Sequence, residues 1–226
     1  MNLQRVATMV ILVALVAAFA IAFWAYPQLP ARVPTHWNAA GEVDGYSGRA
    51  FGAFGLPVIM LGLTLLLLGL PLIDPLRKNI ESFIAEYYVF VAVFELFFLM
   101  LYVQTILWAL GTEISMNAVI SAGCGMLFLA VGWMIGRAKR NFFIGIRTPW
   151  TLMSDEVWDR THKLGSKLFY AAGVCALLGV FAPEYAMWLI MVPTIAAALI
   201  TYAYSYFIYQ QIAPKNGTSG PPPAQG

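Results

Sequence analysis

The 226-residue sequence is 61% hydrophobic and only 11% charged, with a mean hydropathy of +0.75. Soluble domains carry about 25% charged residues, so this composition excludes a water-soluble globular protein. The formal net charge of +2 is too small to indicate nucleic acid as a direct partner. Because lipid offers the backbone no hydrogen-bond partners, long apolar runs in a membrane form helices, and we expect an all-α membrane protein.

Six apolar segments predict transmembrane helices, at about 6–26, 51–73, 83–110, 117–136, 166–182 and 185–210. The first run is longer than the roughly 7 to 15 apolar residues of a secretory signal, so we interpret it as a retained helix. An even number of spans places both termini on the same side of the membrane. The expected fold is therefore a six-helix bundle.

The distribution of basic residues predicts the orientation of the bundle. Of the 13 Lys and Arg residues, only Arg32 and Arg49 fall in connections on the side opposite the termini. Short loops rich in Lys and Arg stay in the cytoplasm, which predicts cytoplasmic N and C termini. The sequence then divides into a 1–75 unit with a long outer loop (27–50), a 76–213 four-helix unit with a long inner loop (137–165), and a 214–226 tail expected to be disordered.

The outer loop combines aromatic, polar and turn-forming residues. We expect a compact structure there, because Pro30 and Pro34 favour extended backbone and the glycines tolerate turns. One interpretation is an outward-facing ligand platform, and the other is a structured cap on the bundle. The platform would consist of His36, Trp37, Asn38, Asp44 and Tyr46.

The inner loop ends in a strong helix start. Ser154 is an expected N-cap, and Asp155 and Glu156 suit the positive end of a helix dipole. A short interfacial helix is therefore predicted here, running into the fifth span, with Val157, Trp158, Thr161, Leu164 and Leu168 on one face. In one interpretation Arg147, Lys163, Trp150 and Trp158 anchor the loop at the lipid headgroups; in the other the loop is a cytoplasmic docking surface.

Glu95 is the ionisable residue deepest in a predicted span. A charge there is costly, so Glu95 is expected to face the bundle interior, with Tyr88 and Tyr102 on the same face at seven-residue spacing. It would either take part in proton or ligand binding or stay neutral and hydrogen-bond neighbouring helices.

Other chemistry finds little support in the sequence. The two histidines, His36 and His162, fall on opposite sides of about 30 Å of hydrocarbon and cannot share a metal ion. Cys124 and Cys175 lie in spans and suggest no metal or disulfide framework. Neither an enzyme nor a cofactor is expected. Gly132 and Gly136 permit a close helix contact but leave the oligomeric state open.

Both long loops resemble one family. The run 141–158, followed by Thr161, His162 and Gly165, resembles the signature of the SdpI family of bacterial immunity proteins. The outer loop resembles the small membrane-associated domain of unknown function that often precedes this signature. The matching inner positions are Asn141, Gly145, Arg147, Thr148, Pro149, Trp150, Ser154, Trp158 and His162; the outer ones are His36, Asn38, Gly41, Asp44, Gly45 and Tyr46.

The resemblance implies a multi-pass protein of the bacterial plasma membrane that protects a cell from a secreted antimicrobial peptide. It also implies, for some members, a sensing role in which the toxin-bound protein holds a transcriptional repressor at the membrane. We therefore expect a peptide toxin as outer partner and a repressor as inner partner. The competing hypothesis is a small proton-coupled transporter or permease that uses Glu95.

Overall fold

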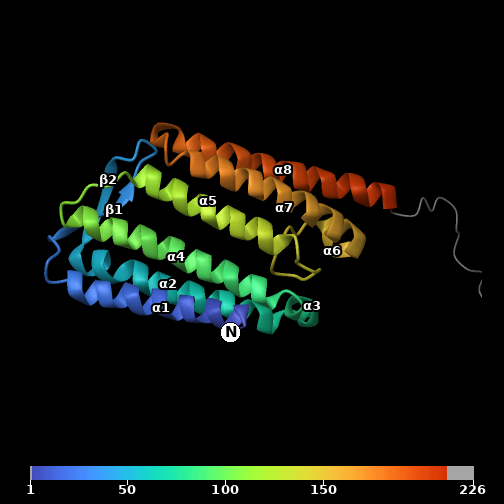
Figure 1. Ribbon diagram of the computed structural model, residues 1–226, viewed down its shortest axis with the longest axis horizontal. Helices are drawn as coiled ribbons and strands as arrows, with labels where there is room; N and C mark the ends of the chain where they lie inside the picture. The colour runs from blue at the N-terminus through green and yellow to red at the C-terminus, as the bar shows by residue number, and fades with distance from the viewer. Residues whose placement is uncertain (1, 213–226) are drawn as a thin grey trace, which may run out of the picture.

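The computed structural model describes residues 2–212 and shows a long bundle of helices with a small hairpin at one end (Figure 1). In chain order the elements are α1 Leu3–Ala25, β1 Arg32–Trp37, β2 Val43–Gly48, α2 Arg49–Ile73, α3 Arg77–Glu81, α4 Ile84–Ala109, α5 Met116–Ile135, α6 Pro149–Met153, α7 Asp155–Leu178, the 3-10 turn η1 Pro183–Tyr185 and α8 Ala186–Ile212. The long helices run side by side, so the hairpin lies at one end, and α3 and α6 lie at the other. We call these the hairpin end and the loop end.

The surface of the bundle is apolar, as a lipid-facing surface must be. Large exposed hydrophobic side chains cover α1, α2 and α8, among them Leu12, Val16, Leu65, Trp188 and Leu199. The core is mainly hydrophobic as well, with a smaller number of buried polar side chains. Helices α1, α2, α4 and α5 and the segment Pro183–Ile212 are long and apolar enough to cross a membrane. The chain is thus a multi-pass membrane protein.

The predicted fifth span differs from the other five. Residues 166–182 largely belong to α7, which starts at Asp155 and carries six charged side chains within its first 13 residues: Asp155, Glu156, Asp159, Arg160, Lys163 and Lys167. The predicted interfacial helix and fifth span are therefore one continuous helix, and a separate short helix, α6, precedes it. The count of six spans and the cytoplasmic termini remain predictions, and the predicted tail at 214–226 lies outside the described residues.

The outer loop corrects the all-α expectation. It forms an antiparallel two-stranded hairpin in which Arg32 pairs with Gly48 and Trp37 with Val43, with irregular register between Pro34 and Trp37. Pro34 is tolerated because a two-stranded sheet has free edges. Val33 is fully buried, and a Cβ on Gly52 would lie 2.5 Å from its Cβ. This close approach seats the hairpin on the start of α2.

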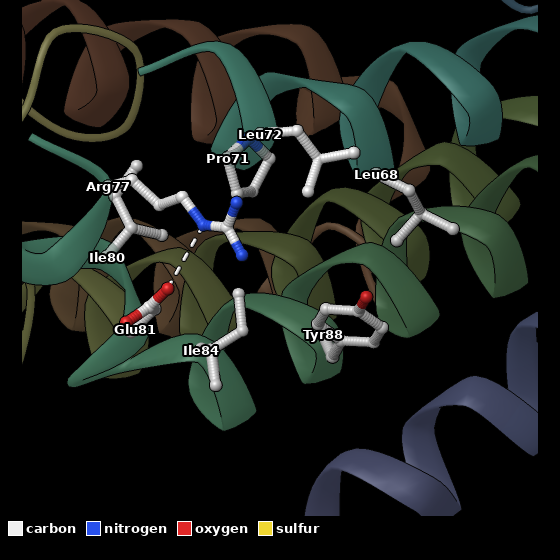
Figure 2. Close-up of a pocket in the computed structure, with 8 residues that line it drawn as sticks. All are labelled: Leu68, Pro71, Leu72, Arg77, Ile80, Glu81, Ile84 and Tyr88. Atoms are coloured by element: carbon white, nitrogen blue, oxygen red, sulfur yellow. Dashed lines mark hydrogen bonds and ion pairs between the residues drawn. The ribbon is translucent and has the colours of Figure 1, made fainter. Parts of the chain in front are cut away.

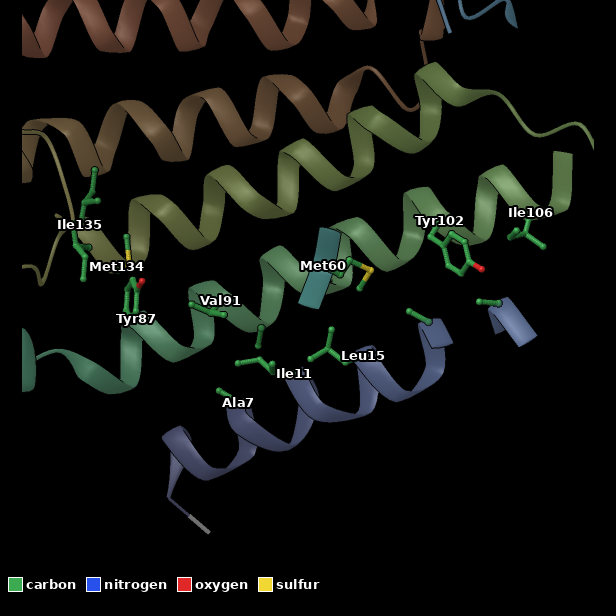
Figure 3. Close-up of a cluster of buried hydrophobic side chains, with 14 of the residues drawn as sticks. Ala7, Ile11, Leu15, Met60, Tyr87, Val91, Tyr102, Ile106, Met134 and Ile135 are labelled. Atoms are coloured by element: carbon green, nitrogen blue, oxygen red, sulfur yellow. The ribbon is translucent and has the colours of Figure 1, made fainter. Parts of the chain in front are cut away.

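Small residues allow the helices to pack closely. On α1 a buried stripe of small side chains, interrupted by Ile11 and Leu15, faces α4 and α2 across Val91 and Met60 (Figure 3). On α5, a Cβ at Gly132 would lie 3.0 Å from the Ser166 carbonyl oxygen, and the Ser166 hydroxyl donates to the Gly132 carbonyl at 2.7 Å. The small-residue pattern of Gly132 and Gly136 thus serves the contact of α5 with α7 inside the chain.

Candidate functional site

The hairpin exposes a polar face at its end of the bundle. His36 Nδ1 and Asp44 Oδ1 lie 2.5 Å apart, and the two side chains are 70% and 45% exposed. Tyr46 follows Asp44 by two positions on β2 and is also exposed, with the Arg32 guanidinium 5.1 Å from its ring centre. Gly45 permits this arrangement, because a Cβ there would lie 2.8 Å from the His36 Cβ. We call Arg32, His36, Asp44 and Tyr46 the hairpin face.

The other two predicted platform residues have different surroundings. Asn38 shapes the turn: its Oδ1 accepts the Ala40 and Glu42 amides, and its Nδ2 donates to the Glu42 carboxylate at 3.1 Å. Trp37 turns toward the bundle and packs edge-on against Trp108 of α4, with ring centres 6.1 Å apart. The predicted outer site is therefore divided: His36, Asp44 and Tyr46 come together, whereas Asn38 and Trp37 build and seat the hairpin.

The turn of the hairpin is also tied to the second half of the chain. Asn117 of α5 donates through its amide to the carbonyls of Ala39 and Pro183, at 3.2 Å each. A cavity of about 220 Å³ opens beside this contact, lined by Trp37, Asn38, Ala39, Asn117, Ile120, Ala186, Met187, Ile190 and Met191. The hairpin turn is thus joined to α5, in addition to the contacts of the strands with α2 and α4.

At the loop end, Asn141 organises the connection between α5 and α6. Its side chain is fully buried; Nδ2 donates to the carbonyls of Lys139 and Ile144, and Oδ1 accepts the amides of Phe143 and Ile144. All the hydrogen-bonding capacity of the amide is used within the loop. Asn141 is therefore a structural centre of the loop and has no group left for a partner.

His162 holds the same loop from α7. The Ile146 amide donates to Nε2 at 2.9 Å, so Nδ1 carries the proton and donates to the Trp158 carbonyl at 2.8 Å. Burial lowers the pKa of His162 to about 4. Gly145 has φ +116°, and a Cβ there would lie 2.5 Å from Nε2. A neutral imidazole and a glycine are thus both required for this contact.

Trp158 completes this packing and is fully buried. Its indole stacks on His162 with ring centres 4.0 Å apart, and its Nε1 donates to the Ala138 carbonyl at 2.8 Å. The interpretation of Trp158 as a headgroup anchor is wrong, because the folded loop covers the face of α7 on which it lies. Val157 and Thr161, predicted on the same face, are buried with it.

The remaining motif residues start helices and contact α8. Thr148 caps α6 in a reciprocal capping box with Thr151, Pro149 takes the first turn, and Ser154 caps α7 as predicted. The Thr148 hydroxyl also donates to Ser205 of α8 at 2.9 Å. Trp150 packs against Tyr202 and Tyr206, with ring centres 5.2 and 5.1 Å away.

Only part of the inner motif is left for a partner. Arg147 is exposed and donates to the Phe142 carbonyl at 2.8 Å, and the side chains of Phe142 and Met153 are exposed as well. We call these three residues the loop patch. Pro149 is exposed too, but it serves the start of α6. Most residues of the inner motif therefore stabilise the folded loop, and the loop patch lies exposed on its surface.

Sequence reasoning missed the contacts that join α2 and α3 to the loop. Asp74 is buried; its carboxylate accepts the Leu76 amide at 2.6 Å and the Phe142 amide at 2.8 Å. Asn79 donates to the Arg140 carbonyl at 2.7 Å, and Arg140 pairs with Asp155 at 2.6 Å. A polar cavity of about 290 Å³ lies among Asn79, Lys139, Arg140, Asp155 and Asp159. The sequence signal for this structure was the Asp74-Pro75 pair, which is typical of a turn and follows an apolar run.

A second cavity at this end is lined mainly by hydrophobic side chains (Figure 2). Its volume is about 170 Å³, and Arg77 and Glu81 form an ion pair at 3.0 Å on its wall. Tyr88 was predicted to share a helix face with Glu95 and Tyr102, but it lines this cavity instead. The tyrosine buried in the bundle interior is its neighbour, Tyr87. Seven-residue spacing did not separate these neighbours, because α4 packs against α1, α2 and α5 at once.

Glu95 lies in the bundle interior, as predicted, with 0% exposure. Neither of its carboxyl oxygens has a hydrogen-bond partner among the described residues. The Thr64 side chain of the neighbouring helix α2 lies beside this carboxyl, and both roles considered for Glu95 stay predictions. No group of three or more potential metal-binding side chains occurs within residues 2–212.

The two motif-bearing segments match known families. Residues 13–61 match a domain of unknown function, DUF1648, and residues 137–205 match the SdpI/YfhL protein family. The chain is 27% identical over 188 residues to the immunity protein SdpI of Bacillus subtilis (strain 168), covering 83% of this chain and 88% of that protein. No solved structure matches. The chain thus carries an SdpI/YfhL family region at residues 137–205, with a DUF1648 segment ahead of it at residues 13–61.

Proposed function

We propose that this protein is a membrane immunity protein that protects a bacterial cell from a secreted, membrane-active antimicrobial peptide. The observation that carries the proposal is the similarity to the immunity protein SdpI, which extends over most of both chains. A likeness confined to the spans would reflect only shared hydropathy. Here the family matches at residues 13–61 and 137–205 also take in the hairpin and the loop, whose contacts are specific.

The hairpin face is the proposed meeting point with the peptide. It offers a carboxylate, an imidazole, a guanidinium and an aromatic ring. These groups lie at the end of helices whose outer surfaces carry many exposed hydrophobic side chains. A membrane-active peptide presents both charge and apolar area, so a mixed polar and aromatic surface at the bilayer suits it. The hairpin is held on α2 and α5 and so is organised before binding.

Protection is tested by expressing the protein in a sensitive bacterium and measuring the growth-inhibitory concentrations of a panel of secreted membrane-active peptides. We expect the inhibitory concentration of at least one peptide to rise, and the double variant His36→Ala, Asp44→Ala to lose that protection at unchanged membrane abundance. Glu113→Ala is the matched control, an exposed acid at the same end outside the hairpin. Unchanged sensitivity to every peptide would contradict immunity, and full protection by the double variant would exclude the hairpin face.

A sensing role is proposed for the loop patch. Arg147, Phe142 and Met153 combine a charge with exposed apolar side chains on a rigid loop, which suits docking of a cytoplasmic protein such as a repressor. A bacterial repressor that controls expression of this protein, carrying a fluorescent tag, should move to the membrane when the peptide is added. Arg147→Ala should abolish the movement and leave protection intact. A tagged repressor that stays on the chromosome would contradict sensing while leaving immunity standing.

A further inference from the structure

Helix α2 contains two prolines within its apolar span, Pro57 and Pro71. Proline has no amide hydrogen, so the carbonyl four residues earlier loses its usual helical donor. The two carbonyls concerned are those of Ala53 and Leu67. In hydrocarbon, water cannot replace the missing donors, so each carbonyl needs a partner from the protein.

Two tyrosines of α4 supply these donors. The Tyr102 hydroxyl donates to the Ala53 carbonyl at 2.7 Å, and the Tyr87 hydroxyl donates to the Leu67 carbonyl at 2.7 Å. Both tyrosines are fully buried and lie on the core side of α4 (Figure 3). Helices α2 and α4 are therefore held together at two levels. We call these two contacts the tyrosine clamps.

Glu95 lies between the clamps along α4, and Thr64 lies between them along α2. The Thr64 hydroxyl lies close enough to the Glu95 carboxyl to interact with it, although the two do not meet full hydrogen-bond geometry. Both side chains are buried and have no other hydrogen-bond partner among the described residues. The clamps satisfy the two proline-freed carbonyls, so Glu95 and Thr64 are left as the polar side chains between them. Their three oxygens are fewer than the six to eight that Ca²⁺ takes.

No basic side chain is placed to neutralise a carboxylate here. The elements packed on α4 carry few titratable groups. These are Arg5 on α1, Arg49 on α2, Cys124 on α5, and Arg32 and His36 on β1 at the hairpin end. Arg5 and Arg49 lie in the first turns of their helices, and the ends of the bundle are remote from Glu95. An ionised, unpaired carboxylate in this interior would cost several kcal/mol or more.

We propose that Glu95, with Thr64 beside it, forms an intramembrane proton-binding site enclosed between α2 and α4 by the tyrosine clamps. The carboxyl holds its proton while the bundle is closed. Loss of the proton requires water or a base to reach the carboxyl, so α2 must move away from α4 and a clamp must open. This site is independent of immunity, since it uses neither the hairpin face nor the loop patch.

Infrared spectroscopy of the purified protein in lipid bilayers tests the proposal. At about pH 8 exposed carboxyl groups are ionised, so a carbonyl band of a protonated carboxylic acid reports a buried acid. We expect this band in the wild type and its loss in Glu95→Gln. Glu86→Gln is the matched control, because Glu86 lies on the same helix, is paired with Arg137 at 3.5 Å and should leave the band unchanged. Absence of the band in the wild type, or its persistence in Glu95→Gln, would overturn the proposal.

Two further variants keep the test decisive if Glu95→Gln does not fold. Thr64→Val should shift the band without removing it, because it changes the polar neighbour alone; an unchanged frequency would exclude Thr64 from the site. Tyr102→Phe should speed deuterium exchange of the acid proton about fivefold, as expected for the loss of one hydrogen bond that holds the site closed. Exchange as fast in the wild type as in Tyr102→Phe would show that the clamps do not enclose the site.

Discussion

At Gly145 a single backbone angle decides whether the inner loop closes on α7. Its φ of +116° is one that residues with an L side chain rarely adopt. An added Cβ would also lie only 2.5 Å from His162 Nε2, so a side chain would clash there. Other motif residues are also used within the fold: Asn141, Trp158 and His162 hydrogen-bond to backbone groups, and the rings of Trp158 and His162 stack on each other. Their resemblance to a family signature therefore reflects folding requirements as well as partner contacts.

Replacing Gly145 by alanine should open the loop. Backbone strain and the displaced His162 contact together should cost about 2 to 4 kcal/mol of stability. Thermal unfolding of the purified protein in detergent measures the loss as a lower Tm. Gly62→Ala is the control, since a Cβ there meets nothing within 4 Å and the position is helical. Equal Tm values for the two variants would contradict the role of Gly145.

His162 makes the stability of the loop depend on pH. Its pKa is lowered in the folded protein from 6.5 to about 4, chiefly by burial, so the unfolded chain binds more protons between these values. The contribution is complete above about pH 6.5 and is lost as the pH falls toward 4, by about 3 kcal/mol in total. Wild-type Tm should therefore fall over this window more steeply than that of His162→Gln. Parallel curves would show that the imidazole is not held neutral.

At the scale of elements, hydropathy predicted the long helices well and the small structures poorly. The helices form where the apolar runs lie because a spanning backbone in lipid must satisfy its own hydrogen bonds, which a helix does within one segment. The hairpin was missed because Pro34 and Gly45 lie inside its strands, where they weaken the usual strand signal. The prediction that Trp158 anchors at the lipid headgroups was wrong, because an apolar helix face has the same sequence pattern whether lipid or a folded loop covers it.

The tyrosine clamps were also invisible in the sequence, since they join residues 49 and 20 positions apart. Tyr87→Phe should destabilise the protein by about 1 to 3 kcal/mol, because it leaves the Leu67 carbonyl unpaired. In a Pro71→Ala background the cost should largely disappear, because alanine restores the helical donor to that carbonyl. Tyr88→Phe serves as the control. Additive effects of Tyr87→Phe and Pro71→Ala in a thermal double-mutant cycle would contradict the pairing.

At the scale of the whole molecule, the two motifs occupy opposite ends of one bundle (Figure 1). Local contacts hold each end: Asn117 ties the hairpin to α5 and η1, and Asp74 ties the α2–α3 turn to the inner loop. The resemblance to a family indicated which segments matter, and hydropathy indicated how far apart they lie. Neither indicated which residues of each motif stay exposed, because that depends on contacts between segments distant in sequence.

The placement of the two ends on opposite faces of the membrane is the claim on which both proposed roles depend. It is tested most directly by labelling single cysteines with a membrane-impermeant maleimide, in a background with Cys124 and Cys175 replaced. Tyr46→Cys reports the hairpin face and Met153→Cys the loop patch, and both positions are exposed. We predict labelling of Tyr46→Cys in intact cells and of Met153→Cys only after the membrane is opened. Labelling of both in intact cells, or the reverse pattern, would contradict this account.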